Sequence, residues 1–86
     1  MALEISPHIA VHPGVWLRDE IITPSNLSPA ALAKLLGLSH EEISSLLNGE
    51  IDLTADLAIR FEKQFGVAAE TLSRMQYRYS ANQAVS

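Results

Sequence analysis

The sequence predicts an all-α domain of five short helices, and two kinds of observation support that prediction. Apolar residues recur at intervals of three and four through most of the chain, which is the period of a helix that buries one face. Serine, threonine or proline precedes most of these segments and glycine follows several, as is typical of helix starts and ends. A length of 86 residues suits a single domain.

The first helix is expected over about Pro13–Ile22. Proline suits the first helical position because its φ is fixed and its missing N–H is not needed there. Pro24 disfavours a helical conformation at the residue before it, which sets the end of the helix. Leu17 and Ile21 lie one turn apart and are expected to face the core. Residues 1–12 are expected to form an extended N-terminal arm.

Two further helices are expected on either side of a glycine. Ser28 can cap the second helix, which ends at Gly37, a residue that readily adopts positive φ at a tight turn. Ser39 can cap the third helix and form a capping box with Glu42. Asn48 and the glycine that follows it close the third helix.

Two helices complete the domain, which is expected to cover residues 13–79. Thr54 can cap the fourth helix, and the fifth is expected over about 69–79. Residues 80–86 are expected to form a flexible polar tail. The fourth helix carries a stripe of apolar residues that recur every four positions: Leu57, Phe61 and Phe65.

The second and third helices have the spacing of a helix-turn-helix motif. Two helices that cross at a wide angle through a short turn need a small residue where they touch, which Ala33 supplies. They also need apolar residues on the inner face of the later helix, here Ile43, Leu46 and Leu47. This arrangement leaves the opposite face of the third helix free to enter a DNA major groove.

The polar face of the third helix supplies candidates for reading DNA bases. Asparagine can bond adenine in two places, serine adapts to several bases, and glutamate can accept a hydrogen bond from cytosine N4. The alternative is a well-packed helix with an ordinary polar outer face. The base-reading candidates are His40, Glu41, Ser44, Ser45 and Asn48.

Phosphate contacts are expected from a small number of residues. Lys34 is the best candidate, because the second helix crosses the DNA backbone in this architecture. Ser28 and Ser39, at the starts of the two helices, are the other candidates. Each remaining cation could contact a phosphate or could be an ordinary solvated surface charge. The second interpretation is favoured for Arg60 and Lys63. The other cations are Arg18, Arg74 and Arg78.

The acidic balance of the chain argues against a dedicated nucleic-acid binder. The formal net charge is -4, and the segment from Ser39 to Asp56 holds no Lys or Arg. Cations usually supply most of the non-specific affinity for DNA. A second hypothesis therefore keeps the fold but uses the acidic face to dock a basic partner protein. The acidic residues of this face are Glu41, Glu42, Glu50, Asp52 and Asp56.

Other classes of site are disfavoured, so neither an enzyme nor a cofactor is expected. The chain has no cysteine, which excludes disulfides and thiolate metal sites. His8 and His12 have a helical spacing, but Pro7 and Pro13 interrupt any helix there, so no metal site is expected. Both histidines are expected to be solvated, with His12 placed against the start of the first helix. With no apolar run of membrane-spanning length and no signal-peptide pattern, a cytoplasmic protein is expected.

Several short motifs in order make residues 12–79 resemble the HigA-type antitoxins of the lambda-repressor-like (Cro/C1, or XRE) helix-turn-helix group. They are His12-Pro13-Gly14, Pro24, Leu27-Ser28, Leu35-Leu36-Gly37-Leu38-Ser39, Ile43-Ser44-Ser45-Leu46-Leu47-Asn48-Gly49, Leu53-Thr54-Ala55-Asp56-Leu57-Ala58-Ile59-Arg60, Phe65-Gly66, Glu70, Gln76 and Tyr79. The resemblance implies a five-helix lambda-repressor-like domain with the helix-turn-helix at helices two and three. It also implies a homodimer that binds an operator palindrome, represses its own operon and neutralises a RelE-like toxin that cleaves mRNA.

The resemblance also implies that dimer contacts lie in the C-terminal part of the chain. Leu72, Met75 and Tyr79 are therefore candidates for a dimer interface, with the core as the alternative, and Trp16 has the same two alternatives. The sequence departs from the family at two places where family members commonly carry basic residues: early in the third helix and just after Asn48-Gly49. Those places hold His40-Glu41-Glu42 and Glu50-Ile51-Asp52, an acidic surface that would suit a basic toxin.

Overall fold

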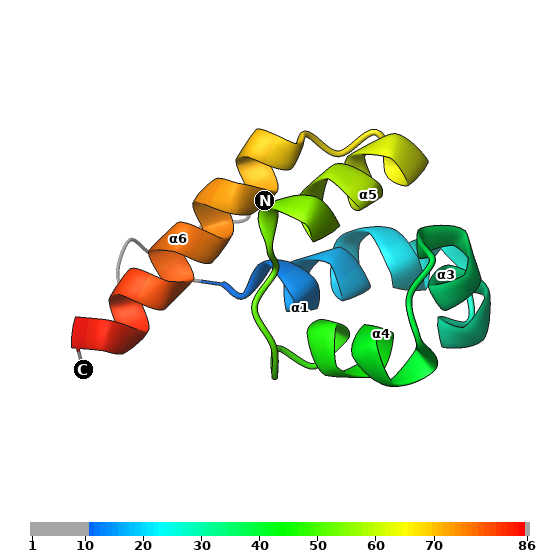
Figure 1. Cartoon of the computed structure of the whole chain (residues 1–86), viewed down its shortest axis with the longest axis horizontal. Coiled ribbons are helices and arrows are strands. Elements are labelled where there is room, and N and C mark those ends of the chain that lie inside the picture. Colours follow the sequence, from blue (N-terminus) through cyan, green and yellow to red (C-terminus); the bar gives the residue numbers. More distant parts are fainter. Residues whose placement is uncertain (1–10, 86) are drawn as a thin grey trace.

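The structure is a computed structural model that describes residues 11–85. In that range the chain forms five helices joined by short loops, with no strand (Figure 1). The all-α fold predicted from the sequence is confirmed. The predicted arm lies almost wholly outside the described residues, as does His8. None of the helices within residues 11–85 has both the length and the apolar character that crossing a membrane requires.

The first helix is longer than predicted and contains a π-helical turn. It is continuous through α1 (Pro13–Leu17), η1 (Arg18–Ile22) and α2 (Thr23–Ser25), so the end predicted at Ile22 was wrong. In a regular α-helix the ring of Pro24 would clash with the carbonyl four residues earlier, and the wider π turn removes that conflict.

The π turn also decides which isoleucine is fully buried in the core. Leu17 is 0% exposed and Ile22, five residues later, is 4% exposed, whereas Ile21 is only half-buried. A π turn inserts one residue into the helix, so the buried position moves from four to five residues after Leu17. Ile21 packs partly buried against the core, in line with its predicted orientation, but the fully buried position after Leu17 is Ile22.

The two helices of the helix-turn-helix begin and end where the sequence predicts. Helix α3 (Pro29–Leu36) is capped by Ser28 and ends at Gly37, which adopts a left-handed φ of 69°. Helix α4 (His40–Leu47) begins with the predicted capping box. In that box the Ser39 hydroxyl oxygen accepts from the Glu42 N–H at 3.0 Å, and the Glu42 carboxylate accepts from the Ser39 N–H at 3.1 Å.

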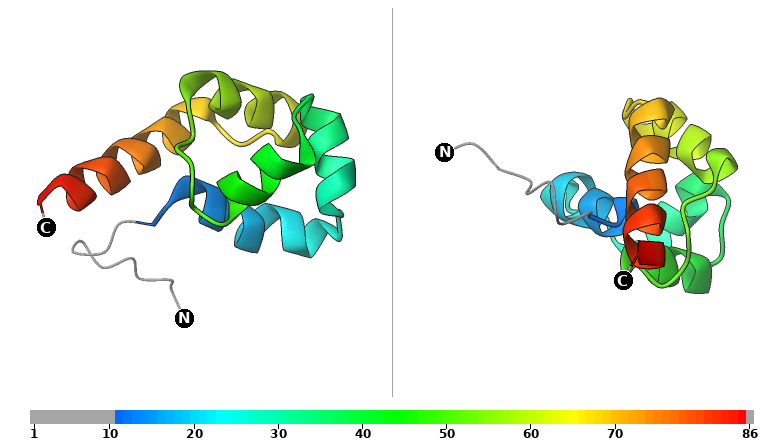
Figure 2. Two further views of the ribbon diagram at one scale, coloured as in Figure 1. Left: turned by 60° about the horizontal axis from the view of Figure 1, so that its bottom comes forward. Right: turned by 90° about the vertical axis from the view of Figure 1, so that its left-hand side faces the viewer.

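Two further helices close the domain. Helix α5 (Ala55–Phe65) is capped by Thr54 as predicted. Helix α6 (Ala69–Val85) continues six residues past the predicted end at position 79. No glycine or proline interrupts this stretch, and Gln76 Nε2 donates to the Ser80 hydroxyl at 3.0 Å across one turn. The last turns of α6 project beyond the other helices in Figure 1 and in the left view of Figure 2.

The core takes apolar side chains from all five helices and from one loop. The predicted stripe on α5 is buried at Phe61, while Leu57 and Phe65 are half-buried. The rings of Phe61 and Phe65 stack with their centroids 6.0 Å apart. The buried apolar residues are Leu17, Ile22, Leu32, Ala33, Leu36, Ile43, Leu46, Leu47, Leu53, Ala58, Phe61 and Leu72.

The candidates for a dimer interface do not share one environment. Leu72 is 0% exposed within one chain, so it belongs to the core, and its assignment to a dimer interface is corrected. Met75 and Tyr79 are half-buried by their own chain. Trp16 packs partly against the core. Contact of these three residues with a second copy remains a prediction.

Candidate nucleic-acid interface

Helix α4 is anchored on one face and open on the other. Ile43 and Leu46 are 0% exposed and Leu47 is 6% exposed, which fixes the inner face in the core. On the outer face His40, Glu41 and Asn48 are exposed, and Ser44 and Ser45 are half-buried. A helix held in this way presents short polar side chains without support from a second subunit. The structure thus brings the five base-reading candidates to one surface, and their contact with bases remains a prediction.

The two serines that cap α3 and α4 keep one hydrogen-bonding function free. The Ser28 oxygen accepts from the Ala31 N–H at 3.1 Å, and Ser39 accepts from Glu42. Each hydroxyl therefore uses an oxygen lone pair for the cap, while its O–H remains able to donate. A phosphate oxygen is a suitable acceptor for that proton, so capping and phosphate contact are compatible at both positions.

Lys34 and His40 line the same open groove between α3 and α4. The other residues that line the groove are small or apolar: Ala30, Ala31, Ala33 and Leu38. The Lys34 side chain is exposed, and no ion pair or hydrogen bond to it is found among residues 11–85. A free cation beside the start of α4 is well placed to meet a phosphate flanking the groove that α4 would enter.

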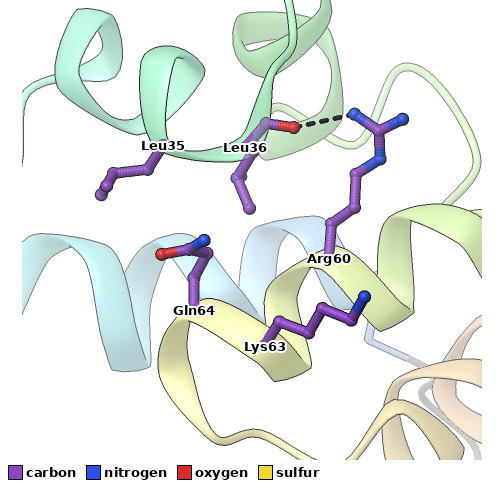
Figure 3. Close-up of a pocket in the computed structure, with 5 residues that line it drawn as sticks. All are labelled: Leu35, Leu36, Arg60, Lys63 and Gln64. Carbon is purple, nitrogen blue, oxygen red and sulfur yellow. Dashed lines mark hydrogen bonds between the residues drawn. The ribbon is translucent and has the colours of Figure 1, made fainter.

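Arg60 performs a structural task that the sequence did not reveal. Its Nη1 donates to the Leu36 carbonyl at 2.8 Å and to the Gly37 carbonyl at 3.4 Å, as the close-up in Figure 3 shows for Leu36. Its Nε donates to Asp56 at 3.0 Å. The guanidinium therefore caps the end of α3 and fixes the turn that leads to α4. It is neither a simply solvated charge, as the sequence analysis favoured, nor a free phosphate contact.

Two other arginines also have partners within the chain. Arg18 donates to Asp19 at 3.1 Å and to the Leu47 carbonyl, at the end of α4, at 3.4 Å. Arg74 pairs with Glu70 at 2.8 Å. Three cations are exposed without such partners in the described part of the chain: Lys34, Lys63 and Arg78. Of these, Lys34 alone lies on the helix-turn-helix.

The acidic residues near α4 divide into engaged and free groups. Glu42 belongs to the capping box, Asp56 pairs with Arg60, and Asp52 accepts from Gln76 at 3.2 Å. Glu41 and Glu50 are exposed and their carboxylates have no hydrogen-bond or ion-pair partner within residues 11–85. Of the three engaged carboxylates only that of Asp56 is neutralised by a cation, so the other four acidic residues keep a negative charge that opposes a phosphate backbone.

The loop after α4 is held by two side chains whose contribution has no signal in the local sequence. Gln76 on α6 accepts from the Leu53 N–H at 2.8 Å, and His12 Nε2 lies 2.9 Å from the Ile51 carbonyl oxygen. His12 is 4% exposed, which corrects the expectation of a solvated histidine, although its predicted place at the start of the first helix is confirmed.

Within residues 11–85 no group of three potential ligands is arranged to hold a metal ion.

Comparison with known proteins identifies relatives of this chain. The helix-turn-helix family matches residues 17–72. The virulence-associated protein I of Dichelobacter nodosus is 39% identical over 75 residues, which cover 87% of this chain and 69% of that protein.

Solved structures with the same fold agree with this match. A structure of the Pseudomonas aeruginosa antitoxin HigA with the higBA promoter superposes with a TM-score of 0.83 at 34% identity, covering 88% of this chain and 83% of that one. An addiction module antidote protein of the HigA family from Coxiella burnetii gives a TM-score of 0.80 at 33% identity, covering 88% and 83%. A Pseudomonas aeruginosa protein in complex with its 28-bp operator DNA gives 0.83 at 34% identity, covering 88% and 84%.

Proposed function

This chain belongs to the helix-turn-helix family, of the XRE type found in HigA antitoxins, and we propose that it binds operator DNA through α4 as a repressor and antitoxin. The observation that carries the proposal is the open polar face of α4, opposite a face locked in the core. The similar Pseudomonas aeruginosa antitoxin HigA was solved with the higBA promoter, which supports the same use of this surface.

The proposal assigns specific roles to the surface residues. Ser44, Ser45 and Asn48 would read base edges, with His40 and Glu41 at the start of the helix. The phosphate contacts are assigned to three residues that flank α4: Lys34, Ser28 and Ser39. The chain would act as a homodimer, with the two copies of α4 in successive major grooves roughly 34 Å apart.

We extend the proposal to a protein partner, a RelE-like toxin that cleaves mRNA and is neutralised by this chain. The likeness to HigA antitoxins supports this part. The free carboxylates of Glu41 and Glu50 add a surface that attracts a basic protein. Co-purification of the chain with the product of the adjacent gene, followed by an mRNA cleavage assay of that product alone and in complex, tests this part.

Titration of a labelled operator-length duplex tests the DNA-binding part. Saturable binding at low salt is expected, with a shallow dependence on salt because few cations are free to neutralise phosphates. The duplex comes from the region upstream of the chain's own gene. If no saturable binding occurs at low salt while circular dichroism shows a folded protein, the DNA-binding proposal fails.

A matched pair of lysine variants makes this test specific to the surface. Lys34→Gln is expected to weaken binding and to lower the slope of log affinity against log salt by about 1 for each phosphate that the lysine no longer neutralises. Lys63→Gln removes the same charge from the exposed surface of α5 and is expected to leave the slope unchanged. Equal effects of the two substitutions would show that overall charge, rather than Lys34, governs binding.

A second candidate function uses the same fold for protein binding without strong DNA binding. The free, exposed carboxylates of Glu41 and Glu50 favour it. The double substitution Glu41→Lys with Glu50→Lys separates the two functions. It is expected to strengthen operator binding if α4 contacts DNA, and to abolish capture of a basic partner if the acidic face is the binding surface.

A further inference from the structure

His12 is the only polar or charged residue among those described that is buried from solvent, at 4% exposure. A buried polar side chain is stable only when its hydrogen-bonding groups are satisfied, and no buried side-chain N or O atom in the described structure lacks a partner. Both ring nitrogens of His12 are therefore engaged in hydrogen bonds, which makes the residue a connection between elements.

The two ring nitrogens have opposite roles. Nδ1 lies 2.9 Å from the Gly14 backbone nitrogen, and because an N–H only donates, Nδ1 must accept. The neutral ring therefore carries its proton on Nε2, which donates to the Ile51 carbonyl oxygen at 2.9 Å. One nitrogen caps α1 and the other holds a residue 39 positions away in the sequence.

The backbone around Ile51 leads directly out of α4. The Asn48 N–H donates to the Ser44 carbonyl at 3.0 Å, and the Glu50 N–H donates to the Ser45 carbonyl at 2.8 Å, so the chain leaves the helix through these bonds. His12 bonds the next residue. The position of the His12 ring therefore constrains the exit of the chain segment that carries Ser44, Ser45 and Asn48.

The ring of His12 also contacts the C-terminal helix. It meets the ring of Tyr79 edge to face, with centroids 4.9 Å apart and planes at 77°. Aromatic pairs in this geometry favour one ring orientation over others. His12 thus joins three parts of the molecule: the start of α1, the exit of α4 and the middle of α6.

From these contacts we propose that His12 is a positioning residue for operator binding, which sets the orientation of α4 by fixing its exit through the Ile51 carbonyl. The inference rests on the proposed function of α4. His12 itself does not touch DNA, because it is buried. The contribution of its Nε2 is separate from that of Nδ1, which stabilises the start of α1 as an N-cap.

Two substitutions separate these contributions. In His12→Asn the side-chain oxygen occupies the place of Nδ1 and can still accept from Gly14, but the side chain is too short to reach Ile51. In His12→Gln the amide NH2 reaches the place of Nε2 and can still donate to Ile51, but the cap at Gly14 is lost.

Operator affinity and thermal stability are measured for both variants, at a temperature at which circular dichroism shows each to be folded. His12→Asn is expected to lose affinity about tenfold in its folded state, and its melting temperature is expected to fall because the bond to Ile51 and the ring contact with Tyr79 are both lost. His12→Gln is expected to have a lower melting temperature and an affinity within about twofold of the original. A role in stability alone predicts that both folded variants bind the operator with the affinity of the unsubstituted chain.

Three results would overturn the proposal. They are full affinity in His12→Asn, an equal loss of affinity in His12→Gln, and a ¹⁵N spectrum of the unsubstituted chain that places the ring proton on Nδ1. The NMR measurement needs no variant, so it holds even if a substitution prevents folding. If the unsubstituted chain itself fails to bind the operator while remaining folded, the proposed function of α4 fails, and the tautomer measurement still tests the bond to Ile51.

Discussion

At the scale of single residues, Arg60 and His12 hold the helix-turn-helix from outside it, each through a hydrogen bond to a backbone carbonyl. The outer face of α4 follows from helical periodicity alone, so its polar candidates could be identified from the sequence. Arg60 bonds the Leu36 carbonyl 24 residues away, and His12 bonds Ile51 39 residues away. Backbone carbonyls have no sequence signature, and such contacts appear only when the fold brings the segments together.

The capping role of Arg60 predicts a measurable loss of stability on substitution. Arg60→Gln is expected to lower the free energy of unfolding by about 1–2 kcal/mol, the low end for hydrogen bonds from a charged group because the side chain is 41% exposed. Urea unfolding followed by circular dichroism measures the change. Lys63→Gln, on the same helix, is expected to cost less than about 0.5 kcal/mol. Equal losses would contradict the capping role.

At the scale of the helices, starts were predicted better than ends. Serine and threonine caps act through neighbouring N–H groups, so the starts of α3, α4 and α5 could be found from the local sequence. The first helix passed Pro24 because a π turn relieved the clash, and α6 continued because nothing in its sequence stops it. A proline argues for a helix end only when the helix stays regular.

The capping box of α4 gives a prediction at this scale. Ser39→Ala removes the acceptor for the Glu42 N–H and is expected to lower the free energy of unfolding by about 1 kcal/mol. Chemical denaturation provides the measurement. Ser73→Ala on the exposed face of α6 is the control and is expected to have an effect within about 0.5 kcal/mol of zero. A loss no larger than the control's would show that the box adds nothing.

The approach of α1 to α4 depends on a residue without a side chain. A Cβ at Gly14 would overlap the carbonyl oxygen and carbon of Leu46, which belong to helix backbone that cannot move aside cheaply. Gly14→Ala is therefore expected to lower the free energy of unfolding by about 3 kcal/mol. The measurement is the shift in the unfolding midpoint of the variant.

Gly66→Ala is the matched control for this substitution. Nothing lies within 4 Å of a Cβ at Gly66, and the strain comes only from its φ of +76°. A loss of about 1 kcal/mol is expected. If the control loses as much as Gly14→Ala, backbone conformation rather than the close approach of the helices explains both effects.

At the scale of the whole molecule, removal of the projecting end of α6 allows folding and dimer formation to be tested separately. Residues 80–83 are exposed within the chain, so removal of residues 80–86 is expected to shift the melting temperature by only a few degrees. Calorimetry measures the shift, and loss of the folding transition would show that the domain extends past position 79.

The same truncation tests where two copies meet. Met75 and Tyr79 remain after the cut, so a dimer built on them is expected to persist in light scattering at the concentrations at which the full chain is dimeric. A monomer that keeps its melting temperature would move the dimer contacts to the removed end of α6. Leu72 contributes in neither case, because its own chain covers it completely.

The half-buried Trp16 gives this chain an intrinsic fluorescent probe of its first helix. It is the only tryptophan and packs partly against the core from the first helix. Fluorescence from an indole shifts to longer wavelength when water replaces apolar neighbours. Emission would therefore report the undocking of a single segment, whereas circular dichroism averages over every helix, and loosening of the N-terminal segment on DNA could be followed without attaching a dye.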